Sequence, residues 1–255
     1  MSDSAQWDRM MASMRAAFGA MPGPSSGGHV IELDGVLAAV TPAVPERSLP
    51  NSVIYDGEDP LIAALPALAS AYADIGVLAW TVWVPEHHSR AREALAAAGH
   101  VLDATPTAML ADLDEVEAPA PGDPEPDPQP SLDDLARVND LAYGTGDVFA
   151  RIIGAGSADP RHNYVARVDG EAAATVVSQD LEGDCSIWWV ATVPSARGRG
   201  LSSAMMKRAL ADGRERGCEV STLQATKLGR PVYARLGYRP LGTIEMWERR
   251  RTAGG

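Results

Sequence analysis

One short segment of the chain holds residue types that bind phosphate groups. It connects an apolar strand to a helix and consists of Arg197, Gly198, Arg199, Gly200, Leu201 and Ser202. The glycines leave backbone N–H groups accessible, and the N-terminus of the following helix favours negative charge. The two arginines add donors that suit phosphate oxygens. The segment therefore predicts a site for a diphosphate or a similar anion.

Other interpretations of this loop are weaker. A dinucleotide-binding loop of the GxGxxG type needs a third glycine, but Ser203 stands at that position. Glu219 follows at a suitable distance, yet it lies beside Cys218 at the start of a strand. A Walker loop is excluded because no Gly-Lys-Ser or Gly-Lys-Thr sequence follows. A turn without any ligand remains an alternative.

The loop and a second motif together resemble one protein family. Positions 197–202 read R-x-x-G-x-S, which is similar to the acetyl-CoA loop R/Q-x-x-G-x-G/A of the GNAT superfamily of N-acetyltransferases, with serine at the last position. Positions 233–238 read Y-x-x-x-G-Y and resemble the Y-x-x-x-G-F/Y ending of that family. Loop, helix, strand and ending occur in the family's order over residues 131–255. The resemblance implies a mixed α/β fold and an acyltransferase that uses acetyl-CoA as a cosubstrate.

The resemblance also implies a role for each matching residue. The backbone of Ala191, Thr192 and Val193 would pair with the pantetheine arm, where this strand splays from its neighbour. Residues 197–202 would hold the pyrophosphate, and Thr226 stands where the family often has a polar contact to pantetheine.

Tyr233 would lie near the thioester sulfur. Acyl transfer expels a thiolate, and reference pKa values are about 8.5 for a thiol and about 10 for a phenol. The Tyr233 phenol therefore stays protonated at neutral pH and can share its proton with the leaving sulfur. Packing of Tyr233 on its own helix is the alternative.

The attacking amine requires a second group. An alkylammonium has a pKa of about 10.4, so it must lose a proton before it attacks. The family often places a glutamate on the strand before the loop, but here that strand reads Ile-Trp-Trp-Val at positions 187–190. Trp188 and Trp189 are expected on opposite faces, so that one could line an acceptor pocket together with Tyr143 and Phe149. The nearest carboxylates lie toward a hairpin turn: Asp180, Glu182 and Asp184. Any of them could act as the base through water, but each is expected to be a solvated turn residue.

The sequence also repeats the same order of elements. An Asp-Gly pair between two apolar strands, a strong hairpin signal, occurs at positions 34–35 and again at 169–170. A helix, a strand and a second helix follow in both halves. Between the halves, residues 119–130 contain six prolines alternating with acidic residues and predict an extended linker. We therefore expect two GNAT-like domains in tandem in a mixed α/β sheet protein, residues 1–118 and residues 131–255.

The first half lacks the chemical parts of the second. At the loop position it carries Asp56, Glu58 and Asp59, which repel a polyphosphate, and Leu95 stands in place of the tyrosine. We expect a degenerate, structural domain whose acidic wall could favour a cationic acceptor. The adjacent histidines at positions 87–88 do not share a face, and no metal site is predicted.

Charge and composition exclude several partners. The 255 residues carry a net charge of −12. Residues 1–130 hold 5 Lys and Arg against 19 Asp and Glu, a net of −14, whereas residues 131–255 hold 17 against 15, a net of +2. This balance argues against nucleic acid and anionic membranes as partners. Two cysteines without a CxxC pair indicate a reducing compartment, and the cytoplasm is the expected location.

The sequence thus predicts an N-acetyltransferase that transfers an acetyl group directly from acetyl-CoA to an amine, with Tyr233 as the catalytic residue. Antibiotics, polyamines, amino acids and protein N-termini all remain open as acceptors. The alternative is a module that binds acetyl-CoA without catalysis, which the missing base and the degenerate first half suggest.

Overall fold

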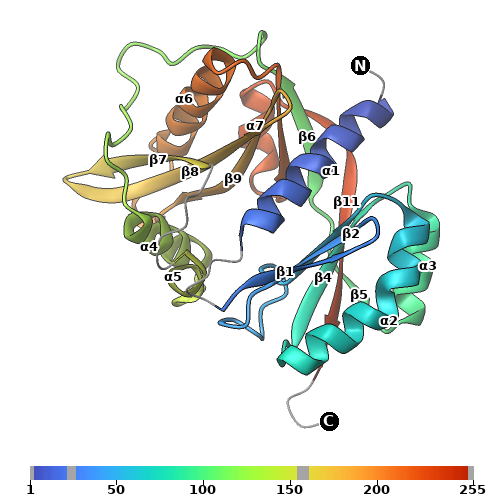
Figure 1. The fold of residues 1–255 in the computed structure, drawn as a ribbon. Coiled ribbons are helices and arrows are strands. Elements are labelled where there is room, and N and C mark those ends of the chain that lie inside the picture. The colour runs from blue at the N-terminus through green and yellow to red at the C-terminus, as the bar shows by residue number, and fades with distance from the viewer. Residues whose placement is uncertain (1–2, 22–26, 154–160, 252–255) are drawn as a thin grey trace.

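The computed structural model describes residues 3–21, 27–153 and 161–251. Its core is one 11-stranded mixed sheet with the order β1-β2-β3-β4-β11-β6-β10-β9-β8-β7, and β5 pairs with β11 beside this path. Helices cover the faces of the sheet, and the two halves of the chain lie at opposite ends of it (Figure 1). The mixed α/β architecture agrees with the sequence-based prediction.

The two halves repeat one order of elements. The first half contains α1 (Asp3–Ala20), β1 (His29–Leu33), β2 (Val36–Val40), β3 (Ser52–Tyr55), α2 (Glu58–Ile75), β4 (Ala79–Pro85), α3 (Ser89–Ala97), β5 (Val101–Ala104) and β6 (Thr107–Asp112). The second half contains α4 (Leu132–Tyr143), α5 (Val148–Ile153), β7 (Arg161–Val168), β8 (Glu171–Leu181), β9 (Asp184–Thr192), α6 (Leu201–Glu215), β10 (Val220–Ala225), α7 (Arg230–Arg235) and β11 (Arg239–Arg250). The short helix α5 was not predicted from the sequence.

Both Asp-Gly hairpins form with two-residue turns. Leu33 pairs with Val36 across the first turn, and Val168 pairs with Glu171 across the second. In the second turn both central residues have positive φ, 52° at Asp169 and 83° at Gly170. This conformation matches the right-handed twist of the flanking strands and suits Asp-Gly.

Each half of the sheet is completed by a strand of the other half. β6, the last strand of the first half, pairs antiparallel with β10 on one side and with β11 on the other. The C-terminal part of β11 in turn pairs with β4 and with β5 of the first half. Residues 119–130 leave the sheet after this exchange and run without helix or strand to α4. The linker therefore separates the two halves along the chain, whereas strands of the two halves are neighbours within one sheet.

The helix α1 lies between the two halves (Figure 1). It contacts β2 and β3 of the first half and β8 and β9 of the second. Its apolar residues Trp7, Met10, Met14 and Phe18 are buried in one cluster, as the helical spacing of these residues predicts. The methionine face of α1 is thus part of the core.

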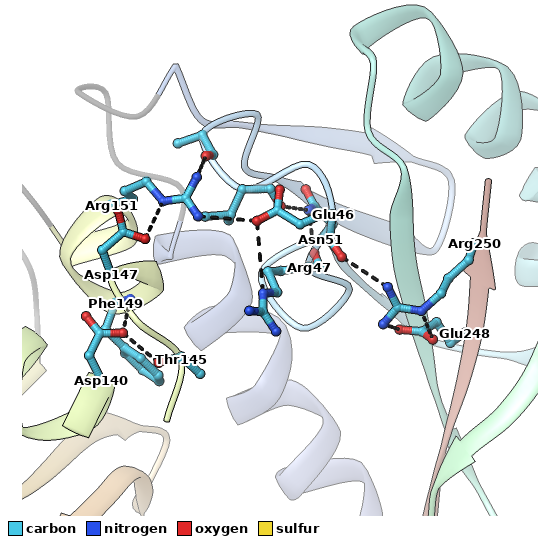
Figure 2. A network of polar contacts seen from close by, with 12 residues as sticks. Glu46, Arg47, Asn51, Asp140, Thr145, Asp147, Phe149, Arg151, Glu248 and Arg250 are labelled. Carbon is cyan, nitrogen blue, oxygen red and sulfur yellow. Dashed lines mark hydrogen bonds and ion pairs between the residues drawn. The ribbon is translucent and has the colours of Figure 1, made fainter. Parts of the chain in front are cut away.

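A polar network fixes α5 against the first half (Figure 2). Arg151 on α5 forms an ion pair with Glu46 at 3.2 Å, and the Glu46 carbonyl accepts a hydrogen bond from Arg250 at the end of β11. The Asp140 carboxylate accepts from the N–H of Phe149 and so caps the start of α5. These contacts orient the helix that carries Phe149.

Candidate active site

The Gly/Arg loop, residues 197–202, leads from β9 into α6. A turn of 3₁₀ helix covers Pro194–Ala196, and α6 begins at Leu201. Gly198 and Gly200 have φ values of 76° and 75°, which favour glycine. Gly200 is the N-cap of α6, and no side chain caps this helix. The first turn of α6 therefore presents N–H groups beside an exposed loop, as an anion site requires.

The two arginines of the loop have different surroundings. Arg197 donates from Nη2 to the Ala142 carbonyl at 2.9 Å and from Nε to the Thr192 carbonyl at 3.4 Å. Its guanidinium thus ties the loop to the end of α4, whereas the sequence-based expectation placed it at the pyrophosphate. Within the described part of the chain, no group forms a hydrogen bond or ion pair with the exposed Arg199 side chain.

The strands β9 and β10 diverge toward this loop. Their parallel pairing is limited to Val220 opposite Asp184, at the start of both strands. Seven residues separate Asp184 from Ala191, which corresponds to about 23 Å of strand. A gap therefore opens between the strands before β9 reaches the loop, as the sequence analysis expected.

The backbone near the gap is only partly free. Ala191 and Thr192 stay paired with β8. The Val193 N–H donates to the Ala173 carbonyl at 2.9 Å, and the Val193 carbonyl accepts from the Ala196 N–H at 3.0 Å. Both backbone groups of Val193 therefore already have a partner within the protein, and the pairing of Val193 with pantetheine stays a prediction.

A β-bulge interrupts β9 at Trp189. The register with β8 shifts between Val177, opposite Trp188, and Thr175, opposite Ala191. Trp189 has a φ of 48°, a left-handed conformation that costs a bulky residue about 1–3 kcal/mol. Both indoles consequently pack against the same two clusters, one around α1 and one around α4 and α5. The expectation that Trp188 and Trp189 point to opposite faces was wrong because it assumed unbroken alternation.

An aromatic group lies beside the bulge. Phe149 stacks on Tyr143 with ring centroids 5.8 Å apart and meets the edge of Trp189 at 5.8 Å. The Tyr143 hydroxyl donates to the Val190 carbonyl at 2.8 Å. The structure thus brings together three of the aromatic side chains that the sequence offered as pocket candidates.

Tyr233 lies on α7 and is half-buried. Burial raises the pKa of the Tyr233 phenol, and the nearby Tyr143 raises it further, so the group is protonated at neutral pH. Gly229 makes room for the ring, because a Cβ there would lie 2.8 Å from Cε2 of Tyr233. Among the described residues, none hydrogen-bonds the Tyr233 hydroxyl. The exposed Thr226 accepts from the Gly229 N–H at 3.1 Å and caps the same turn.

The three candidate carboxylates are not at this site. Asp180 is held by the Arg216 guanidinium, and Glu182 lies in the hairpin turn with a φ of 46°. Asp184 is fully buried and accepts hydrogen bonds from Ser13 and Thr222, both at 2.6 Å. The expectation of a solvated Asp184 was therefore wrong, because its partner Ser13 comes from α1, far away in the sequence.

In the first half, side chains of that half occupy the helix N-terminus that corresponds to the start of α6. Glu58 and Asp59 form the first turn of α2. Glu58 accepts from the backbone N–H of Ala91 on α3 at 2.8 Å, and Asp59 forms an ion pair with Arg90. Carboxylates thus stand at the helix N-terminus where an anion would bind, and they tie α2 to α3.

Two other residues singled out in the first half also have partners. Leu95, at the position of Tyr233, is fully buried. Asp56 forms an ion pair with Arg15 at 3.5 Å. Among the residues that the structure describes, no cluster of His, Cys, Asp or Glu is suited to hold a metal ion, and no helix is long and apolar enough to cross a membrane.

Comparisons with known proteins relate the chain to the GNAT acetyltransferases. Residues 117–238 match the acetyltransferase (GNAT) family. No curated protein matches the sequence. A GCN5-related N-acetyltransferase from Kribbella flavida has a similar structure, with a TM-score of 0.71, 15% identity and coverage of 96% of each chain. A GCN5-related N-acetyltransferase from Sphaerobacter thermophilus has a TM-score of 0.56 at 14% identity, covering 95% of this chain and 93% of that one.

A tandem arrangement also has a structural counterpart. A tandem GNAT protein from the clavulanic acid biosynthesis pathway has a TM-score of 0.51 at 16% identity, covering 76% of this chain and 70% of that one. The chain therefore has the mixed α/β fold of GNAT proteins, with two GNAT-like halves. The match to the acetyltransferase (GNAT) family lies within residues 117–238, just under half of the chain, and the solved structures show the same fold over nearly the whole chain.

Proposed function

We propose that this protein transfers an acetyl group from acetyl-CoA directly to an amine, at a single site in residues 131–255. The observation that carries this proposal is the gap between β9 and β10, which leads to an uncapped α6 at one end and has Tyr233 nearby. Residues 1–118 would act as a scaffold without a cofactor, and residues 119–130 as a linker.

We assign the binding roles from the hydrogen-bond donors that each group can still offer to a ligand. Arg199 and the backbone of Gly198, Gly200, Leu201 and Ser202 would hold the pyrophosphate, because the guanidinium and the start of α6 face solvent without a side-chain cap. Arg197 would position this loop through its two carbonyl contacts. Ala191, Thr192 and Thr226 would border the pantetheine arm.

The reaction needs one proton donor and one acceptor. The neutral amine nitrogen attacks the thioester carbonyl carbon, the C–S bond breaks, and the thiolate takes the proton of the Tyr233 hydroxyl. The new amide nitrogen then loses its extra proton, which restores the Tyr233 hydroxyl. Tyr233 suits this role because its phenol is protonated and its hydroxyl has no described partner. Because no candidate carboxylate lies at the site, the amine would lose its proton to water.

A small cationic amine is the acceptor class that the charge distribution supports. Residues 1–130 hold 5 Lys and Arg against 19 Asp and Glu, and this field concentrates cations near the protein. The two buried free cysteines, Cys185 and Cys218, support action in the reducing cytoplasm.

Binding and turnover of the wild type and two variants test the proposal. Tyr233→Phe should lower kcat by about 100-fold in a thiol-release assay with a panel of amines, while calorimetry shows an acetyl-CoA Kd within about twofold of the wild type. Tyr164→Phe is the matched control, since it removes a hydroxyl that bonds Asp212 elsewhere in the domain.

Each other outcome has a definite reading. Failure to bind acetyl-CoA would overturn the proposal. Binding without turnover of any amine would favour a non-catalytic acetyl-CoA-binding module, the alternative that the lack of a nearby carboxylate supports.

A further inference from the structure

The carbonyls of β9 next to the gap are satisfied in an unusual way. Buried strand carbonyls normally accept from a neighbouring backbone. Here the Trp189 carbonyl accepts from the Thr175 hydroxyl at 3.2 Å, and the Val190 carbonyl accepts from the Tyr143 hydroxyl at 2.8 Å. Side chains therefore hold both peptide groups that flank Val190.

Both hydrogen bonds lead back to one helix. Tyr143 is the last residue of α4, and Asn139 lies one turn before it on the same face. Asn139 is fully buried and donates from Nδ2 to the Thr175 hydroxyl at 3.1 Å and to the Leu135 carbonyl at 2.8 Å. Thr175 is also fully buried, and the hydrogen bond from Asn139 orients its hydroxyl toward the Trp189 carbonyl.

The position of this network suits a role in the reaction. Trp189 keeps a left-handed backbone that a bulky side chain disfavours, and such a conformation persists only where its surroundings enforce it. The bulge borders the gap, opposite the side on which β9 pairs with β8. The end of α4 also receives Arg197 of the Gly/Arg loop through the Ala142 carbonyl. One helix thus contacts both the bulge and the loop.

We propose that Asn139, Thr175 and Tyr143 are positioning residues that hold the β9 bulge in its strained conformation and so fix the backbone facing the acyl group before acetyl-CoA binds. This inference rests on the proposed acetyl transfer. Fixing the backbone in advance lowers the barrier of the chemical step without tightening the binding of the cosubstrate.

Two hydroxyl deletions and their matched controls test the inference. Thr175→Val and Tyr143→Phe each remove one donor to the bulge and keep the shape of the side chain. Thr175→Ser retains the donor, and Tyr164→Phe removes a phenol hydroxyl that bonds Asp212 on α6. The first measurement is hydrogen–deuterium exchange of a peptide that covers residues 186–193. The second is kcat and the acetyl-CoA Kd.

The expected pattern separates positioning from general stability. Exchange in the peptide should accelerate in Thr175→Val and Tyr143→Phe, with kcat reduced about tenfold and the acetyl-CoA Kd changed less than about twofold. Thr175→Ser and Tyr164→Phe should match the wild type in both readouts. The double variant should lose less than the product of the single losses, because both donors act on one bulge.

Other results are equally decisive. Unchanged exchange in Thr175→Val and Tyr143→Phe would overturn the inference, as would faster exchange with kcat intact in an active enzyme. A parallel rise of the acetyl-CoA Kd and fall of kcat in Thr175→Ser would also overturn it. If the wild type turns over no amine, the proposed function fails instead, and the exchange data alone decide whether these residues hold the bulge.

Discussion

Replacing Asp184 by asparagine should remove a pH-dependent part of the stability of this protein. The carboxyl is fully buried at the start of β9, where one oxygen accepts from Ser13 and Thr222 and the other has no partner among the described residues. Burial raises its pKa from 3.8 to about 6, and the two hydrogen bonds only partly oppose this. The folded state therefore favours the protonated carboxyl.

The sign and size of the effect follow from this pKa. A carboxyl whose pKa rises on folding adds stability below its unfolded pKa and loses it as the pH rises through its folded pKa. The full difference corresponds to about 3 kcal/mol, of which about 1.4 kcal/mol is present at pH 5 and almost none at pH 8. Asparagine keeps an acceptor oxygen for Ser13 and Thr222 but cannot ionise.

Urea unfolding followed by tryptophan fluorescence measures the effect. Between pH 8 and pH 5 the free energy of unfolding of the wild type should rise by about 1.4 kcal/mol relative to that of Asp184→Asn. Asp180→Asn is the control. Burial acts to raise the pKa of Asp180, but the Arg216 guanidinium outweighs it and lowers that pKa, so the wild type should show no such gain toward pH 5 relative to this variant. Equal pH dependence in the wild type and Asp184→Asn would refute the reasoning.

Three further predictions concern other parts of the molecule. Burial lowers the pKa of His100 to about 4, so this histidine adds stability above about pH 6.5 that is lost as the pH falls toward 4. Between pH 8 and pH 5 the free energy of unfolding of the wild type should therefore fall by about 2 kcal/mol relative to that of His100→Phe, as urea titrations would show. Arg199→Ala should raise the acetyl-CoA Kd about tenfold or more without changing the melting temperature, whereas Arg197→Ala should lower the melting temperature as well, as calorimetry would show. Residues 131–255 expressed alone should lack cooperative unfolding, because β10 and β11 lose β6 between them; a sharp thermal transition of that fragment would contradict the exchanged sheet.

Local signals in the sequence predicted the local parts of the fold. The glycine of each Asp-Gly pair has a positive φ, as has Asp169, and few residues adopt this backbone, so the pairs mark their turns; Gly198 and Gly200 mark the loop before α6 for the same reason. Ser131 is a residue type that favours the N-cap position of a helix, and its hydroxyl accepts from the Asp134 N–H at the start of α4. Each of these features depends on residues within a few positions of one another.

Contacts between distant segments could not be predicted in this way. The four buried positions of β6 suit any central place in a sheet, so nothing in them selects β10 and β11 as neighbours. Asp184 looks like a turn residue until α1 brings Ser13 to it. The bulge at Trp189 breaks an alternation that a strand of apolar residues does not reveal. The contacts of Arg197 with Ala142 likewise join segments that the sequence shows only as separate motifs.

The exchange of strands between the two halves determines when the sheet can be completed during folding. β11 follows every other described element in the chain, yet its last residues lie between β4 and β5. During synthesis the first half therefore emerges first but keeps two unpaired strand edges until residues 244–250 have been made. Open edges of this kind invite pairing with other chains. The half that carries no Gly/Arg loop is thus the half most exposed to misassembly, and the strand that protects it is supplied by the second half.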